Sequence, residues 1–283
     1  MTRSDSAPVV DIRGIYKEFE VDGSRTLALD GIDLAISPGE FVSLIGPSGC
    51  GKSTLLRLIG DLTGPTRGSI EVNGKPARQA RSDRDYGMVF QAPVLFDWRT
   101  IEANVQLPLE IVGVGTDERR RRASEMIDLV ELSEFGRHHP WQLSGGMQQR
   151  AAIARALVIQ PKLLLMDEPF GALDEMTRER MNSELLRIWE RTGTTVVFVT
   201  HSIPEAVFLS SRVVVMSARP GRLTHVIGID LPRPRDESTR ELDRYYELVT
   251  EVREALKAGR GPVTEESEMA AEFGARVSPE HTP

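Results

Sequence analysis

The sequence has one cysteine, Cys50, among its 283 residues. A single cysteine cannot form a disulfide within the chain, which is typical of proteins from a reducing compartment such as the cytoplasm. No segment approaches the roughly 18 consecutive apolar residues that a membrane-spanning helix needs, and the opening residues 1–8 lack the apolar core of a secretory signal. We therefore predict a soluble globular chain that reaches a membrane only through another protein.

Positive charge is also in deficit, because 42 acidic residues face 35 basic ones and the net charge is −7. No overall positive field exists to attract nucleic acid or anionic lipid. The segment 236–283 holds 12 acidic and 6 basic residues, which leaves 30 acidic and 29 basic residues in 1–235. The body of the chain is thus nearly neutral, so charge alone still allows a local basic groove. We predict that 236–283 forms a charged C-terminal helix and tail, in part disordered.

Short apolar runs rich in branched residues recur along the chain and are typical of strands buried on both faces. Four such runs are Phe41 to Ile45, Leu163 to Met166, Thr195 to Val199 and Val213 to Met216. Helix-like segments lie between them, such as Glu175 to Arg191, which repeats apolar residues at helical spacing and meets Gly193 as a stop. Strands that alternate with helices predict an α/β layered fold.

The stretch from about 92 to 158 has a different character and lacks long branched runs. A helix is predicted to start at Asp117, with four apolar residues on one face: Ala123, Met126, Ile127 and Val130. We interpret this stretch as a helical subdomain. Its run of four arginines, 119–122, is open to interpretation as a lipid or RNA patch, but the neighbouring acids favour a solvated helix face.

A phosphate-binding loop follows the strand that ends at Ile45. The loop is Gly46-Pro47-Ser48-Gly49-Cys50-Gly51-Lys52-Ser53-Thr54, and a helical segment comes directly after it. Its glycines allow backbone N–H groups to turn toward phosphate oxygens, and the helix directs its positive end at the same anion. Lys52 supplies a positive charge for the β and γ phosphates, and Ser53 offers a hydroxyl to Mg²⁺.

Two carboxylates, Asp167 and Glu168, end a second apolar strand, at the edge where α/β sheets bind ligands. Asp167 is suited to hold Mg²⁺, and Glu168 to orient or deprotonate the water that attacks the γ phosphate. His201 ends another strand and can hydrogen-bond near that phosphate. Gln91 offers an amide oxygen to Mg²⁺. Taken alone, a histidine is more often structural, and most glutamines simply face solvent.

A second helix start carries the features of an anion site. Ser144-Gly145-Gly146 opens a helical segment, with exposed N–H groups and a hydroxyl. One nucleotide cannot easily use this start and the phosphate loop of the same chain. The sequence therefore predicts two copies that share nucleotides across an interface.

These motifs make the chain similar to the ATP-binding cassette (ABC) ATPases from about Val9 to Leu231. The matched segments are the phosphate loop, the Q-loop at Gln91, the signature at Leu143 to Gln148, the carboxylate motif at Leu163 to Glu168, the D-loop at Ala172 to Asp174 and the switch histidine His201. In this family aspartate often stands where this chain has Ser202. The resemblance implies a P-loop NTPase core in 1–235 with a helical and an antiparallel β subdomain.

The resemblance also implies a head-to-tail dimer that binds two ATP molecules with Mg²⁺, each between one chain's phosphate loop and the other chain's Ser144, Gly145 and Gly146. Phe19 is then expected to stack on adenine, with Tyr16 as the second choice, and Asp174 is expected at the nucleotide interface. Glu168, His201 and Gln91 take the catalytic roles. The expected metal ligands are Ser53, Gln91 and Asp167.

The wording around the signature, from Leu143 to Arg150, and the segments Glu168 to Asp174 and Arg219 to Arg222 resemble the nitrate/sulfonate/taurine group of importer ATPases. This implies transmembrane permease subunits, a separate solute-binding protein and a place on the cytoplasmic face of the membrane. The solute would be a nitrate-, sulfonate- or taurine-like molecule or a heterocyclic precursor. An exporter ATPase and a soluble ABC ATPase of nucleic-acid maintenance remain alternatives, although no nucleic-acid partner is expected.

Overall fold

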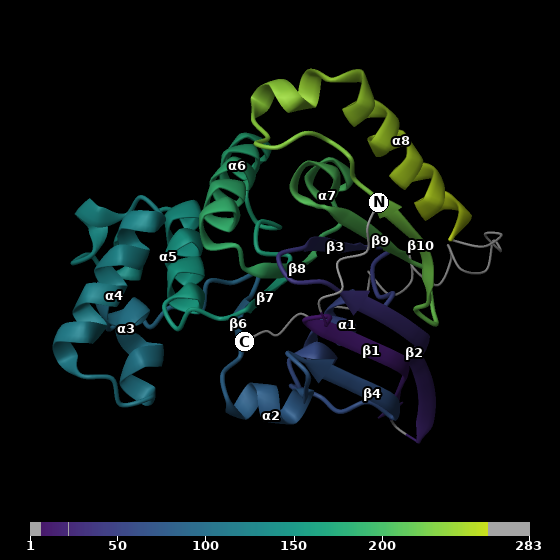
Figure 1. Cartoon of the computed structure of the whole chain (residues 1–283), viewed down its shortest axis with the longest axis horizontal. Coiled ribbons are helices and arrows are strands. Elements are labelled where there is room, and N and C mark those ends of the chain that lie inside the picture. The colour runs from purple at the N-terminus through teal and green to yellow at the C-terminus, as the bar shows by residue number, and fades with distance from the viewer. Residues whose placement is uncertain (1–6, 22, 260–283) are drawn as a thin grey trace, which may run out of the picture.

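The computed structural model describes residues 7–21 and 23–259, and two β-sheets with surrounding helices make up this part of the chain (Figure 1). The larger sheet has six strands in the order β10-β9-β3-β8-β7-β6. Strands β3, β6, β7, β8 and β9 run parallel, and β10 pairs antiparallel to β9 at the edge. In chain order the six strands are β3 (Phe41–Ile45), β6 (Tyr86–Val89), β7 (Leu163–Asp167), β8 (Thr195–Val199), β9 (Arg212–Met216) and β10 (Leu223–Gly228). The four strands predicted from apolar runs are confirmed, with ends that agree to within one residue.

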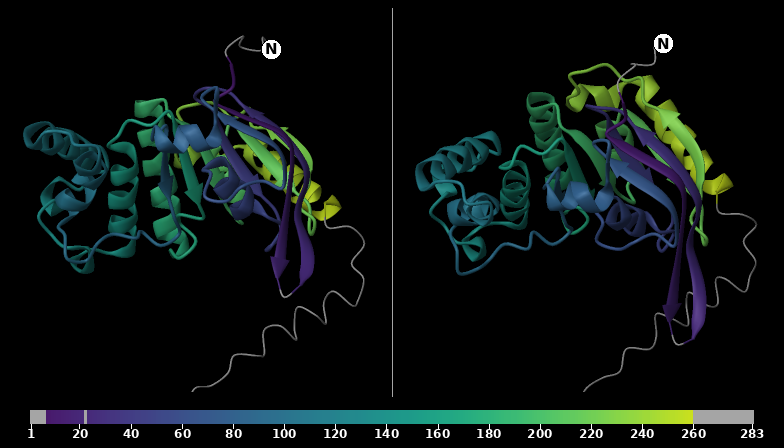
Figure 2. Two further views of the ribbon diagram at one scale, coloured as in Figure 1. Left: turned by 90° about the horizontal axis from the view of Figure 1, so that it is seen from below. Right: turned by 60° about the horizontal axis from the view of Figure 1, so that its bottom comes forward.

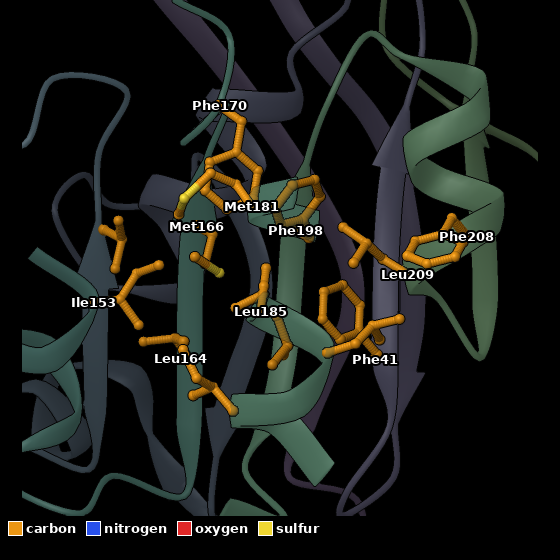
Figure 3. Close-up of a cluster of buried hydrophobic side chains, with 14 of the residues drawn as sticks. Phe41, Ile153, Leu164, Met166, Phe170, Met181, Leu185, Phe198, Phe208 and Leu209 are labelled. Atoms are coloured by element: carbon orange, nitrogen blue, oxygen red, sulfur yellow. The ribbon is translucent and has the colours of Figure 1, made fainter. Parts of the chain in front are cut away.

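The two faces of this sheet support two separate clusters of buried side chains, because side chains along a strand alternate between faces. In β7, Leu164 and Met166 join one cluster while Leu163 and Leu165 join the other. The first face is covered by helices α5 (Gly145–Leu157), α6 (Glu175–Thr192), α7 (Ile203–Leu209) and α8 (Asp243–Ala258). Figure 3 shows Phe41, Phe198 and Phe208 in this cluster among side chains of α6.

The second face packs on helix α1 (Lys52–Ile59) and on a four-stranded antiparallel sheet. That sheet has the order β2-β1-β4-β5 and is built from β1 (Val10–Val21), β2 (Ser24–Ile36), β4 (Arg67–Val72) and β5 (Lys75–Pro76). Helix α2 (Ala77–Ser82) follows β5. Figure 2 shows β1 and β2 as a long pair of strands that extends beyond the other helices and strands. Helix α1 thus lies in one core with both sheets, which fixes the position of its first residues.

A group of helices stands to one side of the sheets (Figure 1). It consists of α3 (Ile101–Ile111), α4 (Thr116–Leu129), η1 (Ser133–Phe135), η2 (Pro140–Gln142) and α5. The predicted helical face is confirmed in α4, where Ala123 and Ile127 are buried. Within the arginine run, Arg120 and Arg121 are exposed, and Arg121 pairs with Glu118 and Glu125, which supports the solvated interpretation.

The C-terminal part begins with η3 (Glu237–Glu241) and continues into α8. Helix α8 buries Tyr245, Leu248 and Val252 against the first cluster. The predicted charged tail from 260 onward lies outside the described residues. Among those that are described, no helix combines the length and apolar character that crossing a membrane requires. The six-stranded sheet, with helices on one face and α1 and the antiparallel sheet on the other, confirms the predicted α/β fold.

Candidate functional site

The loop between β3 and α1 curls around the ammonium group of Lys52. This side chain is only 6% exposed, and its Nζ donates to the carbonyl oxygens of Gly46 at 2.8 Å and Pro47 at 3.1 Å. Helix α1 begins at Lys52 without any side-chain cap. The first N–H groups of such a helix need another acceptor, and its positive end favours an anion.

At two glycines in this loop, any larger residue would clash with neighbouring atoms. A Cβ atom on Gly46 would lie 2.7 Å from Cys50 Sγ, and Gly51 has a φ of +95° with its Cβ position 2.6 Å from Leu29 Cδ2. Cys50 itself is buried, and burial raises the pKa of its thiol. Because the thiolate is the reactive form of cysteine, Cys50 is suited to filling space in the loop and not to redox chemistry.

Oxygen and carboxylate groups converge on the start of α1 from neighbouring strands. Ser53 Oγ donates to Asp167 Oδ1 at 2.7 Å, although 114 residues separate the two. Glu168 has a φ of +46°, and its N–H donates to the Val199 carbonyl at 3.0 Å. The Nδ1 atom of His201 lies 3.2 Å from Glu168 Oε2. The parallel strands β7 and β8 therefore bring the predicted carboxylates and histidine to one edge of the sheet.

Gln91 follows β6, the next strand of the same sheet, and its side chain is exposed. A Cβ atom on Gly171 would lie 3.1 Å from Gln91 Nε2, which places the amide over the turn that follows Glu168. The hydroxyl of Ser53, the carboxylate of Asp167 and an amide oxygen are hard ligands of the type that Mg²⁺ prefers. The donor set therefore fits that ion.

The two aromatic candidates for adenine stacking differ in their surroundings. Phe19 in β1 is 40% exposed, and the Lys17 ammonium lies 4.8 Å from its ring centroid. Tyr16 is turned toward Gly31, where an added Cβ atom would lie 3.3 Å from its hydroxyl. Phe19 is thus the more exposed of the two.

The second predicted helix start faces a different part of the chain. Ser144 is exposed and caps α5 by accepting from the Met147 N–H at 3.4 Å. A Cβ atom on Gly145 would lie 3.7 Å from Leu173 Cδ2, and one on Gly146 would lie 3.4 Å from Thr177 Cγ2. These residues therefore contact the segment around Ala172 to Thr177 and not the phosphate loop.

Asp174 lies in that same segment and caps helix α6. Its Oδ1 accepts from the Thr177 N–H at 3.0 Å, and this hydrogen bond lowers the pKa of the carboxyl. Asp174 is exposed, so its other oxygen is open to the surface.

Two contacts at the site were missed from the sequence. The Arg219 guanidinium lies over the phosphate loop, with Nη2 2.9 Å from the position of a Cβ atom on Gly49. Gln149 in α5 donates from Nε2 to the Phe90 carbonyl at 2.9 Å, next to Gln91. In the sequence, the segment Arg219 to Arg222 indicates only a family resemblance. No local signal could place either side chain, because both contacts join residues far apart in the sequence.

The sequence is matched by the family model described as "ABC transporter" over residues 29–171. An uncharacterised ABC transporter ATP-binding protein of Methanocaldococcus jannaschii is 47% identical over 85% of this chain and 90% of its own length. The nitrate import ATP-binding protein NrtD of Synechocystis is 43% identical over 93% and 99%. An aliphatic sulfonates import ATP-binding protein, SsuB of Bacillus cereus, is 40% identical over 88% and 96%.

Solved structures of an ABC transporter cassette are also similar to this chain. A dimeric structure of the ABC transporter cassette MJ0796 superposes with a TM-score of 0.68 and 38% identity, covering 78% of this chain and 98% of that one. A second structure of the cassette, in a post-hydrolysis state with ADP and Pi, also gives a TM-score of 0.68, with 36% identity and the same coverage. The loop around Lys52, the pair Glu168–His201 and these relatives together show that the chain belongs to the ABC transporter ATP-binding proteins, as an ATPase of the nitrate and sulfonate importer group.

Proposed function

We propose that this chain is the ATP-hydrolysing subunit of an importer and that it energises uptake of a small solute through separate transmembrane permease subunits. The observation that carries the proposal is the proximity of His201 to Glu168 at the strand edge that also holds the Ser53–Asp167 pair. The solute would resemble nitrate, a sulfonate or taurine, or would be a heterocyclic precursor. A solute-binding protein would deliver it, and the chain would lie on the cytoplasmic face of the membrane.

The phosphate loop would bind the β and γ phosphates of ATP. Phosphate oxygens are stronger acceptors than the carbonyls of Gly46 and Pro47, so Lys52 would turn its N–H groups toward them. The loop amides from Gly46 to Thr54 and the N-terminus of α1 would surround the same charge. Phe19 would stack on the adenine ring.

Mg²⁺ would be held by Ser53, Asp167 and Gln91, and when bound it neutralises the negative charge of the phosphates. Glu168 would act as general base on the attacking water. His201 would donate to the γ phosphate from the ring nitrogen that does not face Glu168, and Gln91 would orient the water from the opposite side.

The second copy of the chain would complete each site. Helix α5 presents Ser144, Gly145 and Gly146 away from its own phosphate loop, and Asp174 stands beside them. A head-to-tail dimer would put these residues of one copy against the ATP bound by the other. ATP binding would close the dimer, and hydrolysis would reopen it.

The permease would bind an exposed apolar surface that contains two tryptophans. We call Val94, Trp98 and Trp141 the tryptophan patch; their side chains are 57%, 76% and 71% exposed. His139 joins its two parts, because its ring stacks near Trp141 and its Nδ1 lies 3.2 Å from the Asp97 carbonyl. Exposed tryptophans on a fixed backbone are typical centres of protein interfaces.

The chemical proposal is tested by Glu168→Gln. This variant should still bind ATP but lose hydrolysis by about a thousandfold, because it lacks the base, and an ATP-stabilised dimer should accumulate on a sizing column. Glu134→Gln, a change of the same type at an exposed position, should hydrolyse ATP normally. Steady-state hydrolysis by Glu168→Gln at the control rate would remove Glu168 from its role.

The permease proposal is tested by Trp98→Ala. Loss of a central interface tryptophan costs about 2 kcal/mol or more, so co-purification with the permease from membranes should fall by about thirtyfold. Val226→Ala, which removes an exposed apolar group from β10, should co-purify as the unaltered chain does. Co-purification with ribosomes or DNA, and with no membrane subunit, would contradict the importer assignment.

A further inference from the structure

Asn104 in α3 is a buried amide that the roles above do not use. Its side chain is fully buried, and a buried amide is costly unless its polar atoms are paired. The backbone of α3 does not need this side chain, because the Asn104 N–H already donates to the Thr100 carbonyl at 2.9 Å. The partners of the Asn104 side chain lie instead in the residues that precede α3.

The Asn104 side chain is paired with residues 96–100, which we call the Trp98 loop. Its Oδ1 accepts from the Phe96 N–H at 2.8 Å. Its Nδ2 donates to the carbonyls of Phe96 at 3.1 Å, Arg99 at 3.1 Å and Thr100 at 3.0 Å. Asparagine supplies both an acceptor and donors to the loop, whereas a leucine of similar size would supply neither. One side chain thus holds both ends of the Trp98 loop.

Trp98 lies at the tip of the turn that Asn104 holds. The Arg99 N–H donates to the Phe96 carbonyl at 3.0 Å, so Asp97 and Trp98 are the central residues of a β-turn. The rings of Phe96 and Trp98 lie 4.7 Å apart, centroid to centroid, and the Trp98 side chain is exposed. Asn104 is too deeply buried to contact another protein, so it can act on an interface only through this turn.

Two further contacts hold the Trp98 loop. His139 Nδ1 lies 3.2 Å from the Asp97 carbonyl, and the Thr100 hydroxyl caps α3 by accepting from the Ala103 N–H at 3.2 Å. A loop that is ordered in advance loses less conformational entropy when it binds, so more of the contact energy remains as affinity. The Trp98 loop therefore has the properties of an anchor that is in place before a partner arrives.

We propose that Asn104 is a positioning residue for the permease interface: it holds the Trp98 loop in its binding shape, so that Trp98 enters the interface as a preformed anchor. This role rests on the proposed function, in which the tryptophan patch binds the permease. Asn104 acts on affinity for the permease and takes no part in ATP hydrolysis.

The test uses the full chain and the permease subunits that it retains from detergent-solubilised membranes. Each variant competes with the unaltered chain for these subunits, so the retained fraction reports relative affinity. Asn104→Leu keeps the size of the side chain but loses its hydrogen bonds to the Trp98 loop, and its affinity should fall about tenfold. Its kcat and KM for ATP without the permease should stay within about twofold of the unaltered values.

Two more variants separate positioning from general damage. Asn104→Ser retains one donor and one acceptor and should lose only about threefold in affinity; it takes the place of Asn104→Leu if that variant does not fold. The double variant Asn104→Leu with Trp98→Ala should bind at most about twofold more weakly than Trp98→Ala alone, because Asn104 acts through Trp98. In Asn104→Leu, hydrogen exchange should rise about tenfold in residues 96–100 and stay unchanged in α5.

Gln106→Leu is the matched control. Gln106 is a second buried amide of α3, but its Nε2 donates to Glu102 Oε1 at 2.9 Å, within the same helix. This variant should keep its affinity for the permease within about twofold. Ile127→Ala removes buried apolar atoms from α4 and controls for stability: its melting temperature should fall, yet its affinity should also stay within about twofold.

Three outcomes would overturn the proposal: Asn104→Leu, or Asn104→Ser in its place, competes as the unaltered chain does; Ile127→Ala loses as much affinity as the Asn104 variant; or the effects of the Asn104 and Trp98 changes multiply. Normal competition by Trp98→Ala would instead refute the tryptophan patch as the permease site, which is part of the proposed function.

Discussion

Two helices of this chain, α1 and α5, begin in glycine-containing segments that suit an anion, yet their surroundings differ. The start of α1 lies in a core made by both sheets, has no side-chain cap and buries Lys52. The start of α5 lies at the surface, and Ser144 of the chain itself provides the cap. The same local pattern thus occurs once in a fixed setting and once in an open one.

The difference between the starts of α1 and α5 shows how one chain can carry both halves of an anion site without bringing them together. At α1 the amide groups are fixed but without a side-chain acceptor, so a ligand is needed to satisfy them. At α5 the Ser144 hydroxyl already accepts from one N–H group, that of Met147, and the exposed Gly145 would allow another molecule to approach the backbone closely. In the proposed dimer, the start of α1 would bind the phosphates, whereas the start of α5 would contact the ATP of the partner copy.

The largest expected effect comes from breaking the fixed setting. Gly51→Ala forces a side chain onto a φ of +95° and within 2.6 Å of Leu29 Cδ2. Such strain costs about 1–3 kcal/mol, and relief of the contact would displace the loop around Lys52. ATP binding, measured by equilibrium dialysis, should be lost, and thermal stability should fall.

Gly64→Ala is the control, because that glycine has an ordinary backbone conformation and no neighbour within 4 Å of an added Cβ atom. It should bind ATP as the unaltered chain does. Normal binding by Gly51→Ala would mean that α1 is no more fixed than α5.

The surroundings of the start of α1 could be predicted from sequence more fully than those of the start of α5. Strand β3, the phosphate loop and α1 are contiguous, and the burial of β3 on both faces leaves a clear apolar run. Likewise α6 ends at Thr192, and the φ of +63° at the C-cap residue Gly193 explains the stop. Local patterns determined these elements because the physical causes are local.

Contacts between distant segments could not be predicted in this way. Arg219 lies over Gly49 because the turn after β9 folds back onto the phosphate loop, and Arg222 anchors that turn through Asp30. Glu205 stands three residues after Ser202, which is the spacing of a capping box, yet its carboxyl accepts from the Thr200 hydroxyl instead.

Mixing two variants tests whether the start of α1 in one copy and the start of α5 in the other act on the same ATP. Lys52→Ala should inactivate the fixed start, and Ser144→Arg should block the open one, so neither variant alone should hydrolyse ATP. A mixed dimer has one site with both defects and one with neither. With random pairing, half of the dimers are mixed, and activity should return to about a quarter of the unaltered rate.

The measurement is steady-state phosphate release at equal total chain concentration, with each variant alone as control. Full-rate hydrolysis by the Ser144→Arg chain alone would contradict a shared site. Absence of any recovery on mixing, when both variants are folded, would contradict the head-to-tail arrangement.

The smallest effect concerns a third helix start, that of α6, where Asp174 supplies from the chain the anion that α1 lacks. Its carboxylate accepts from the Thr177 N–H, and this bond lowers the pKa from the ordinary value of 3.8. A lowered pKa stabilises the fold above the ordinary value, and the stabilisation is lost as pH falls through the folded pKa. Asp174→Ala should therefore lower the melting temperature of the nucleotide-free chain by a constant small amount above pH about 5. Below pH about 5, the difference in melting temperature from the unaltered chain should shrink.

Asp174→Asn keeps the acceptor without the charge and should show a smaller difference in melting temperature, with little dependence on pH. A melting difference for Asp174→Ala that grows on acidification would mean that the carboxylate does not act as the built-in anion of this helix.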